Sequence, residues 1–220
     1  MGLVFRLEDY AHYREAVGEA TYIDLTRRSD PARSPRAWDN LRAVVETYGA
    51  PWIVQIWTKD PAGVLRMGDD LPAALREAGT TLTAQVTITG LAGTPWEPLV
   101  PGGAMADIPA LAAALGGIEH ITWRYDPIIP TVHRTERFEQ LAQQAADMGL
   151  SRGVINFISP PGRYVRVDRR LAPMLPSWAE DMPGYDDAWR QTVAGELVER
   201  AEAAGIALAC CAESAGLAEA

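Results

Sequence analysis

The stretch Thr81-Leu82-Thr83-Ala84-Gln85-Val86-Thr87-Ile88-Thr89 decides the fold, because its polar and apolar side chains alternate. Successive side chains of a β-strand point to opposite faces of the sheet, so this strand has one polar and one apolar face. Residues 121–126 alternate in the same way, with Thr122, Arg124 and Asp126 on the polar face. Central strands of an open doubly wound sheet are apolar on both faces. The alternation therefore favours a parallel barrel with helices over its apolar face and a polar lumen.

Helical patterns separate the apolar stretches along the chain, which predicts a succession of β–α units. Strands are expected at residues 22–26, 52–57, 81–89, 118–125, 153–158 and 206–211, and helices at residues 36–48, 71–78, 108–115, 134–148 and 186–204. Strands separated by helices pair in parallel through right-handed crossovers. The predicted fold class is α/β, a partial (β/α)6 TIM-like barrel with parallel strands. Residues 1–220 are expected to form a single domain, with residues 1–20 as an added N-terminal helix; a doubly wound open sheet is the alternative.

Composition and charge narrow the classes of partner. The 220 residues carry a formal charge of -9, which disfavours general binding to nucleic acid or to anionic lipid. No apolar run approaches the ~20 residues of a membrane helix. The two cysteines, Cys210 and Cys211, are neighbours and offer no ordinary disulfide framework, which favours a reducing cytoplasm. We expect a small polar molecule as the partner, and the sequence does not indicate an oligomeric state.

Polar side chains gather where the predicted strands end, and in parallel barrels the working groups lie at these carboxyl ends. The candidate catalytic residues are Lys59, Asp126, Glu213 and Cys211; the candidate ligand-binding residues are Arg27, Arg28, Asp30, Trp57, Gln85, Thr87, Glu97, Arg124 and Asn156. Helix starts also recruit Asp and Pro as caps, so Asp30, Asp60 and Pro127 have a purely structural interpretation as well.

Arg124 and Lys59 have the most defined chemistry among these candidates. Arg124 lies mid-strand on the polar face, where a charge needs a partner or a ligand. It either forms an ion pair with Glu213 or Asp126, or grips a carboxylate or phosphate. Lys59 is a candidate Schiff-base or general-acid residue, with a simple salt bridge as the alternative.

Cysteine and histidine positions add little chemistry. The alternation places Cys211 in the lumen and Cys210 in the core; a small buried apolar side chain and a reactive thiol are both compatible with Cys211. His12, His120 and His133 lack metal-ligand spacing, so no metal site is predicted, and no glycine-rich phosphate loop or H-E-x-x-H motif occurs.

Taken together, the strand ends resemble a bacterial family known as domain of unknown function eighteen-forty-eight. The matching segments, in chain order, are Thr26-Arg27-Arg28-Ser29-Asp30-Pro31, Trp57-Thr58-Lys59-Asp60-Pro61, Gln85-Val86-Thr87-Ile88-Thr89 with Glu97-Pro98, Trp123-Arg124-Tyr125-Asp126-Pro127-Ile128 and Cys211-Ala212-Glu213. The family motifs that they resemble are S-R-R-T-D-I-P, W-T-K-N-P, Q-F-T-L-T with E-P, W-R-Y-D-P-I and C-A-E. Each motif is short, but the ordered set spans nearly the whole chain.

The resemblance implies a radical-SAM-like barrel with distant similarity to spore photoproduct lyase. It also implies S-adenosylmethionine and an iron–sulfur cluster held by a C-terminal C-x-x-x-C-x-x-C motif. This sequence departs from that pattern, because Cys210 and Cys211 are its only cysteines. The expectation is therefore either a fragment of a longer cluster-binding protein or a short relative without the cluster.

Three functions remain open at this stage. The first is the barrel domain of a radical-SAM-like enzyme that binds a small polar ligand, S-adenosylmethionine being one candidate, without its own iron–sulfur ligands. The second is an iron-independent barrel enzyme of the lyase or hydrolase type that uses Lys59, Asp126 and Glu213. The third is a non-catalytic module that binds a small molecule.

Overall fold

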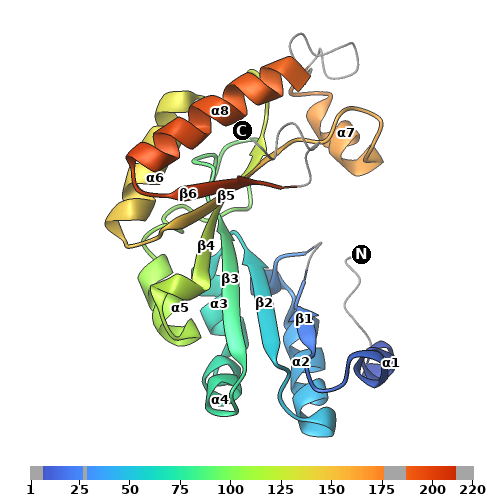
Figure 1. The fold of residues 1–220 in the computed structure, drawn as a ribbon. Helices are drawn as coiled ribbons and strands as arrows, with labels where there is room; N and C mark the ends of the chain where they lie inside the picture. The colour runs from blue at the N-terminus through green and yellow to red at the C-terminus, as the bar shows by residue number, and fades with distance from the viewer. Residues whose placement is uncertain (1–6, 27–28, 176–186, 212–220) are drawn as a thin grey trace.

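A single parallel sheet organises the molecule. The computed structural model describes residues 7–26, 29–175 and 187–211. The strands are β1 (Tyr22–Asp24), β2 (Ile53–Thr58), β3 (Thr81–Thr87), β4 (Ile121–Ile128), β5 (Arg152–Phe157) and β6 (Ala207–Cys210). All neighbouring strands pair in parallel, in the order β1-β2-β3-β4-β5-β6, which leaves β1 and β6 at the two edges (Figure 1).

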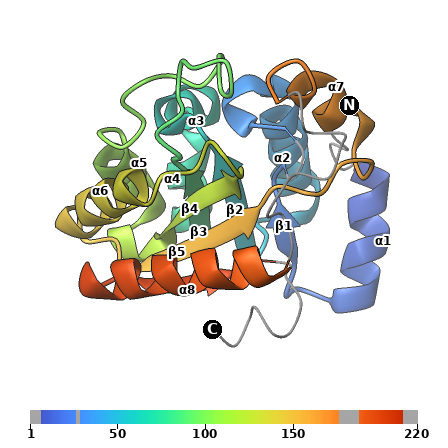
Figure 2. The ribbon, with the colours of Figure 1, turned by 90° about the horizontal axis from the view of Figure 1, so that it is seen from above.

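The helices lie on the convex side of this curved sheet. They are α2 (Pro35–Tyr48), α3 (Pro61–Gly68), α4 (Leu71–Glu77), α5 (Ile108–Leu115), α6 (Thr135–Asp147) and α8 (Asp187–Ala203), with short 3-10 turns η1 (Pro31–Arg33) and η2 (Ile118–His120). Seen from above, α2, α3, α5, α6 and α8 surround the strands (Figure 2). The strands have the same order in the sheet as in the chain. Right-handed crossovers between such strands all lie on the same face of the sheet. The predicted partial barrel is therefore confirmed, and the doubly wound alternative is wrong.

The main core fills the space between the sheet and these helices. Val86 and Trp123 on the convex face of the sheet are fully buried, as are Leu41, Phe138 and Leu197 on the covering helices. The ring centroids of Trp123 and Phe138 lie 5.1 Å apart. The alternation predicted from the sequence thus separates a dry convex face from a concave face that carries the polar side chains.

A second, smaller apolar cluster lies at the carboxyl ends of the strands. Its buried members are Ile129, Ile158, Leu171 and Leu175, and Trp96, Val132, Val167 and Met174 pack against it. We call it the edge cluster. It joins the loops after β3, β4 and β5 to α7 (Val165–Leu171), so it holds together segments that are far apart in the sequence.

Several elements differ from the prediction. Neither α3 nor α7 is among the predicted helices. α3 begins directly after β2, because Asp60 caps it and Pro61 stands in its first turn. α7 covers a basic stretch that contains Arg166, Arg169 and Arg170. Pro127 caps no helix and lies inside β4.

At the N-terminus α1 (Leu7–Val17) buries Tyr10 against Tyr48, with ring centroids 5.6 Å apart. Within the described ranges no helix is long and apolar enough to cross a membrane.

Candidate functional site

Asp30 and Asp60 hold the loop that follows β2. Oδ1 of Asp30 accepts the N–H of Ala32 at 3.0 Å and the hydroxyl of Thr58 at 2.8 Å, and Oδ2 accepts the N–H of Lys59 at 2.7 Å. Asp60 caps α3, since its Oδ1 accepts the N–H of Gly63 at 2.8 Å. Both carboxylates therefore act structurally here, and together they fix the backbone on either side of Lys59.

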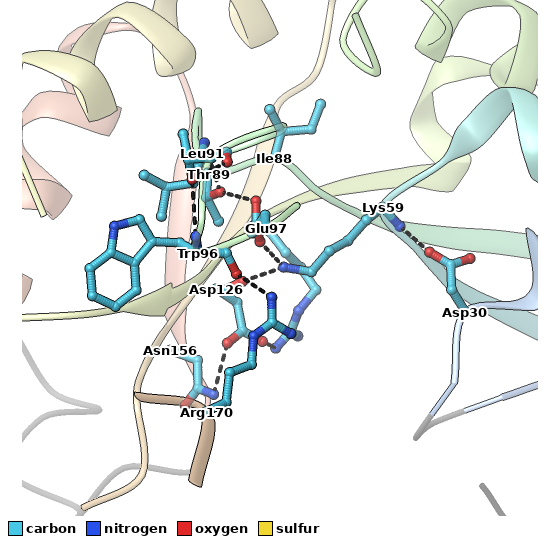
Figure 3. A network of polar contacts seen from close by, with 12 residues as sticks. Asp30, Lys59, Ile88, Thr89, Leu91, Trp96, Glu97, Asp126, Asn156 and Arg170 are labelled. Atoms are coloured by element: carbon cyan, nitrogen blue, oxygen red, sulfur yellow. Dashed lines mark hydrogen bonds and ion pairs between the residues drawn. The ribbon is translucent and has the colours of Figure 1, made fainter. Parts of the chain in front are cut away.

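The Lys59 side chain forms an ion pair with Glu97 at the carboxyl edge (Figure 3). Its Nζ donates to Oε1 of Glu97 and to the backbone oxygen of Asp126, the latter at 3.3 Å. The other carboxylate oxygen of Glu97 accepts the hydroxyl of Thr89 at 2.6 Å. The Lys59 side chain is 33% exposed and that of Glu97 is 10% exposed. Residues from the ends of β2 and β4 and from the loop after β3 thus meet at one amine.

A tight turn brings Glu97 to this position. Ala92 and Glu97 form an isolated parallel bridge, and the N–H of Gly93 donates to the backbone oxygen of Glu97 at 3.0 Å. The hydroxyl of Thr94 donates to the backbone oxygen of Leu91 at 2.6 Å. The long connection from β3 to α5 is therefore ordered next to the site by its own hydrogen bonds.

Arg124 lies on the concave face of the sheet, on β4, two residues before Asp126, whose backbone oxygen contacts Lys59. Its Nη1 donates to Oε1 of Gln85 at 2.6 Å, and its Nη2 pairs with Oδ2 of Asp126. Oδ1 of Asp126 accepts from Nδ2 of Asn156 at 3.2 Å. The guanidinium lies 4.5 Å from the ring centroid of Trp57 and is almost fully buried. Of the two ion pairs predicted for Arg124, the structure describes the one with Asp126, and the hydrogen bonds and the ring compensate the buried charge.

A cavity of about 280 Å³ opens beside Lys59. Its polar lining comes from Lys59, Glu97 and Arg170, the last of which also donates to the backbone oxygen of Trp96 at 2.9 Å. The apolar walls are Leu91, Trp96, Pro98, Leu99, Val100, Pro127, Ile129, Ile158, Val167 and Leu171. The edge cluster therefore forms one side of a pocket whose other side carries an ion pair.

The remaining predicted site residues lie elsewhere. Thr87 lines a separate cavity of about 270 Å³, together with Met105, Gln144 and again Glu97. Arg27, Arg28 and Glu213 fall outside the described residues. Cys211 follows the last residue of β6, and its N–H donates to the backbone oxygen of Ile155 at 2.9 Å.

Of the residues that line the cavity, the sequence predicted Lys59 and Glu97 as site candidates but none of the others, among them Trp96 and Arg170. Arg170 belongs to the basic stretch at residues 163–170. This stretch has four arginines, and the sequence does not show which of them lines the cavity. The apolar residues Val167 and Leu171, which are four positions apart, are the local signal of a helix face there.

The cysteines do not fit the iron–sulfur cluster that the family resemblance implied. Cys210 is the last residue of β6 and packs against the main core, and Cys211 follows it directly. Two neighbouring cysteines do not supply the three spaced thiolates that such a cluster needs. Across residues 7–26, 29–175 and 187–211, no three His, Cys, Asp or Glu side chains are grouped as a metal site.

A pair formed by the buried Tyr125 and the half-buried His133 lies near the site, on the other face of β4 from Arg124 and Asp126. The hydroxyl of Tyr125 and Nδ1 of His133 are 3.1 Å apart. Burial raises the pKa of Tyr125 to about 12 and lowers the pKa of His133 below its ordinary value. Both rings are therefore neutral at physiological pH, which suits a pair that supports the loop from β4 to α6.

Comparison with known proteins identifies the family and no characterised relative. Searches of curated proteins and of solved structures returned no significant match. A family model described as Domain of unknown function (DUF1848) matches residues 33–220, which include β2 to β6 and every described residue of the site except Asp30. The chain therefore belongs to the family described as Domain of unknown function (DUF1848).

Proposed function

We propose that the carboxyl edge of this barrel binds a small organic molecule with an acidic group, and that the chain is the substrate-binding domain of an enzyme. The observation that carries the proposal is the Lys59–Glu97 ion pair on the wall of a largely apolar cavity, whose other charged lining residue is Arg170. Charged groups facing apolar surface are unfavourable unless they serve a ligand or a neighbour. Ligand sites combine such apolar walls with a few placed polar groups.

The charges of the lining support an anionic ligand. Lys59 and Arg170 contribute two positive charges, whereas Glu97 contributes one negative charge that Lys59 and Thr89 already engage. A carboxylate or phosphate placed between Lys59 and Arg170 would complete the charge balance. Guanidinium groups have several N–H donors, so the bond from Arg170 to the backbone of Trp96 leaves donors for a ligand.

The size of the cavity supports a ligand with a compact apolar body. A cavity of about 150 Å³ is enough for a benzene ring, and this one has about 280 Å³. Leu91, Ile129, Ile158 and the Trp96 side chain supply the apolar surface. We therefore propose a single ring or a short branched chain, bearing the acidic group, as the ligand.

Arg124 and Asp126 do not line the cavity, and in this proposal they support it from the concave face of the sheet. Both oxygens of Asp126 already accept hydrogen bonds, from Arg124 and from Asn156. This supports a positioning role for Asp126, which holds its own backbone oxygen against the Lys59 amine. The radical-SAM-like activity suggested by the family resemblance is not part of the proposal, because Cys210 and Cys211 do not fit a cluster. The only two cysteines are neighbours in the sequence and offer no ordinary disulfide framework, which supports a reducing compartment, and we propose the cytoplasm.

Calorimetric titration tests the proposal. The probes are phenylacetate and 4-methylvalerate, each compared with its uncharged amide. We expect both acids to bind and both amides to bind at least about tenfold more weakly, as loss of a charge-assisted hydrogen bond implies. Arg170→Gln should weaken acid binding by about tenfold. Arg166→Gln is the matched control, since Arg166 lies on the same helix, is exposed and does not line the cavity.

Two results would overturn the proposal. One is equal affinity for acids and amides. The other is equal affinity of the Arg170→Gln and Arg166→Gln variants for phenylacetate, because the proposal places the acidic group against Arg170.

A further inference from the structure

Lysine occurs once in this chain. The sequence has 20 lysine and arginine residues, and Lys59 is the single lysine, so the other 19 are arginine. Arginine serves for surface charge throughout the molecule, from α1 to α8. The one position that keeps an amine is the one whose Nζ lines the cavity at the carboxyl edge.

An ion pair alone gives no reason for a lysine at this position. Apart from one pair with histidine, every other ion pair among the described residues uses arginine as its cation. Examples are Arg42–Asp70, Arg124–Asp126 and Arg200–Glu139. Arginine binds a carboxylate with two parallel hydrogen bonds, so it suits a purely structural partner of Glu97 better than lysine does. What arginine lacks is a primary amine that can lose its proton and attack a carbonyl carbon.

We propose that Lys59 forms an imine with its substrate, and that the substrate is an oxo acid, a molecule with both a carbonyl and an acidic group. The inference rests on the proposed function, since the acidic group takes the place argued for it beside Arg170. The carbonyl carbon then faces Nζ of Lys59, and the apolar body lies against the edge cluster.

The surroundings of Lys59 suit a nucleophile that must be held in place. Its backbone N–H donates to Oδ2 of Asp30 at 2.7 Å. In the flanking residues, the backbone N–H of Asp60 donates to the hydroxyl oxygen of Thr58 at 2.9 Å. At the other end of the side chain, Glu97 and the backbone oxygen of Asp126 orient the amine. A rigid backbone with an oriented amine reduces the entropy lost when substrate and nucleophile meet.

Glu97 supplies the proton transfers that imine formation needs. The Lys59 ammonium gives a proton to the Glu97 carboxylate. The neutral amine then forms the C–N bond with the carbonyl carbon as the carbonyl π bond opens, and a proton passes from the nitrogen to the oxygen to give a carbinolamine. Glu97 then returns the proton to the carbinolamine hydroxyl, the C–O bond breaks, and water leaves. The balance is one ammonium and one carbonyl giving one protonated imine and one water, with Glu97 unchanged. The apolar body of the substrate displaces water from the cavity, which favours the first transfer because that transfer removes two charges from a drier site.

Reductive trapping tests this inference, and the single lysine makes the readout clean. The whole chain is incubated with phenylpyruvate or 4-methyl-2-oxovalerate and sodium cyanoborohydride at neutral pH, then examined by intact mass and peptide mapping. We expect one adduct, on Lys59. The Lys59→Arg variant keeps the charge and has the N-terminal amine as its only primary amine, so its adduct measures the background. Wild type should exceed that background at least about tenfold, as expected for an activated nucleophile.

Glu97→Gln separates a positioned amine from an activated one. The variant keeps a hydrogen-bond acceptor for Lys59 but cannot take its proton, so adduct formation should slow by about 100-fold. Circular dichroism establishes that each variant is folded.

The outcomes distinguish the two proposals. Binding of an oxo acid by calorimetry without an adduct on Lys59, or with an adduct on the N-terminal amine only, overturns the imine and leaves the proposed function standing. An adduct on Lys59 with an unchanged rate in Glu97→Gln overturns the role of Glu97. Failure of all acids to bind overturns the proposed function itself.

Discussion

The carboxylate of Asp30, which follows β1, accepts the backbone N–H of Lys59, which follows β2, at 2.7 Å. This bond crosses from one β–α unit to the next at the carboxyl edge. The same carboxylate also binds the hydroxyl of Thr58 and the N–H of Ala32. Asp30 is therefore the point at which the first unit fixes the loop that carries the amine.

Replacing Asp30 by alanine should lower the free energy of unfolding by about 2–3 kcal/mol. Three hydrogen bonds to a charged and partly buried group are lost together, and each buried donor is left without its acceptor. Urea denaturation measures the change. Asp39→Ala is the matched control, because Asp39 is exposed on α2, and its effect should stay within about 0.5 kcal/mol. Equal decreases in the free energy of unfolding in the two variants would contradict the structural role given to Asp30.

Arg124 and Asp126 should show strong energetic coupling. Arg124→Met leaves the Asp126 carboxylate without its cation and should cost about 3–5 kcal/mol. Arg124→Met combined with Asp126→Leu removes both charges and should be less destabilised than the sum of the single variants by about 1–3 kcal/mol. A double-mutant cycle from urea denaturation gives this coupling energy. If the effects of the two single substitutions on the free energy of unfolding simply add up, Arg124 and Asp126 have no coupling energy and the prediction is wrong.

His133 should make the stability depend on pH in the mildly acidic range. Its pKa is lowered in the folded protein because burial disfavours the charged ring, with an opposing contribution from Glu196 and further lowering by Arg137. In the unfolded chain the imidazole has its ordinary pKa of 6.5. The unfolded state therefore binds the proton first, and stability is fully present above that pH and is lost as the pH falls toward the folded pKa.

Urea denaturation at pH 7.5 and at lower pH measures this dependence. In His133→Asn the part of the loss that begins near pH 6.5 should disappear. His12→Asn is the control, because His12 is exposed on α1 and its replacement should leave the pH profile as in the wild type. An identical profile for the wild type and His133→Asn would contradict the prediction.

Leu171→Ala should loosen the carboxyl edge without loosening the sheet. Leu171 belongs to the edge cluster, which is separate from the main core that holds β3 and β4. Hydrogen exchange should become faster in α7 and in the loop around Trp96, while the amides of β3 stay protected. Phe138→Ala is the comparison, since it opens a cavity in the main core at a cost of about 3–5 kcal/mol and should raise exchange throughout the sheet. Uniform exchange in Leu171→Ala would mean that both clusters unfold as one unit.

Sequence reasoning reached the polar face of the sheet because alternation is a local signal. Gln85, Arg124 and Asn156 stand on β3, β4 and β5 at positions that a strand pattern alone assigns to one face. Lys59 was found in the same way, as a charged residue directly after an apolar strand. These residues meet because parallel strands bring their carboxyl ends to one edge.

The other half of the site depends on tertiary packing and left little trace in the sequence. Arg170 is one of several arginines in a short helix, and what selects it is the backbone oxygen of Trp96, 74 positions away in the chain. The partner of Arg124 could be narrowed to two carboxylates, Asp126 and Glu213, and only the fold distinguishes a neighbour on the same strand. The division into a main core and an edge cluster is likewise set by how three loops pack together.

The sequential strand order has a consequence for how the protein is made. Each strand pairs with the strand before it, so every pairing joins one β–α unit to the next unit along the chain, and the sheet can grow in the order of synthesis. The amine of Lys59 acquires its full set of partners only when the loop bearing Glu97 and the end of β4 have both arrived. The contacts of the Lys59 amine are therefore completed only after the chain has been synthesised as far as the end of β4.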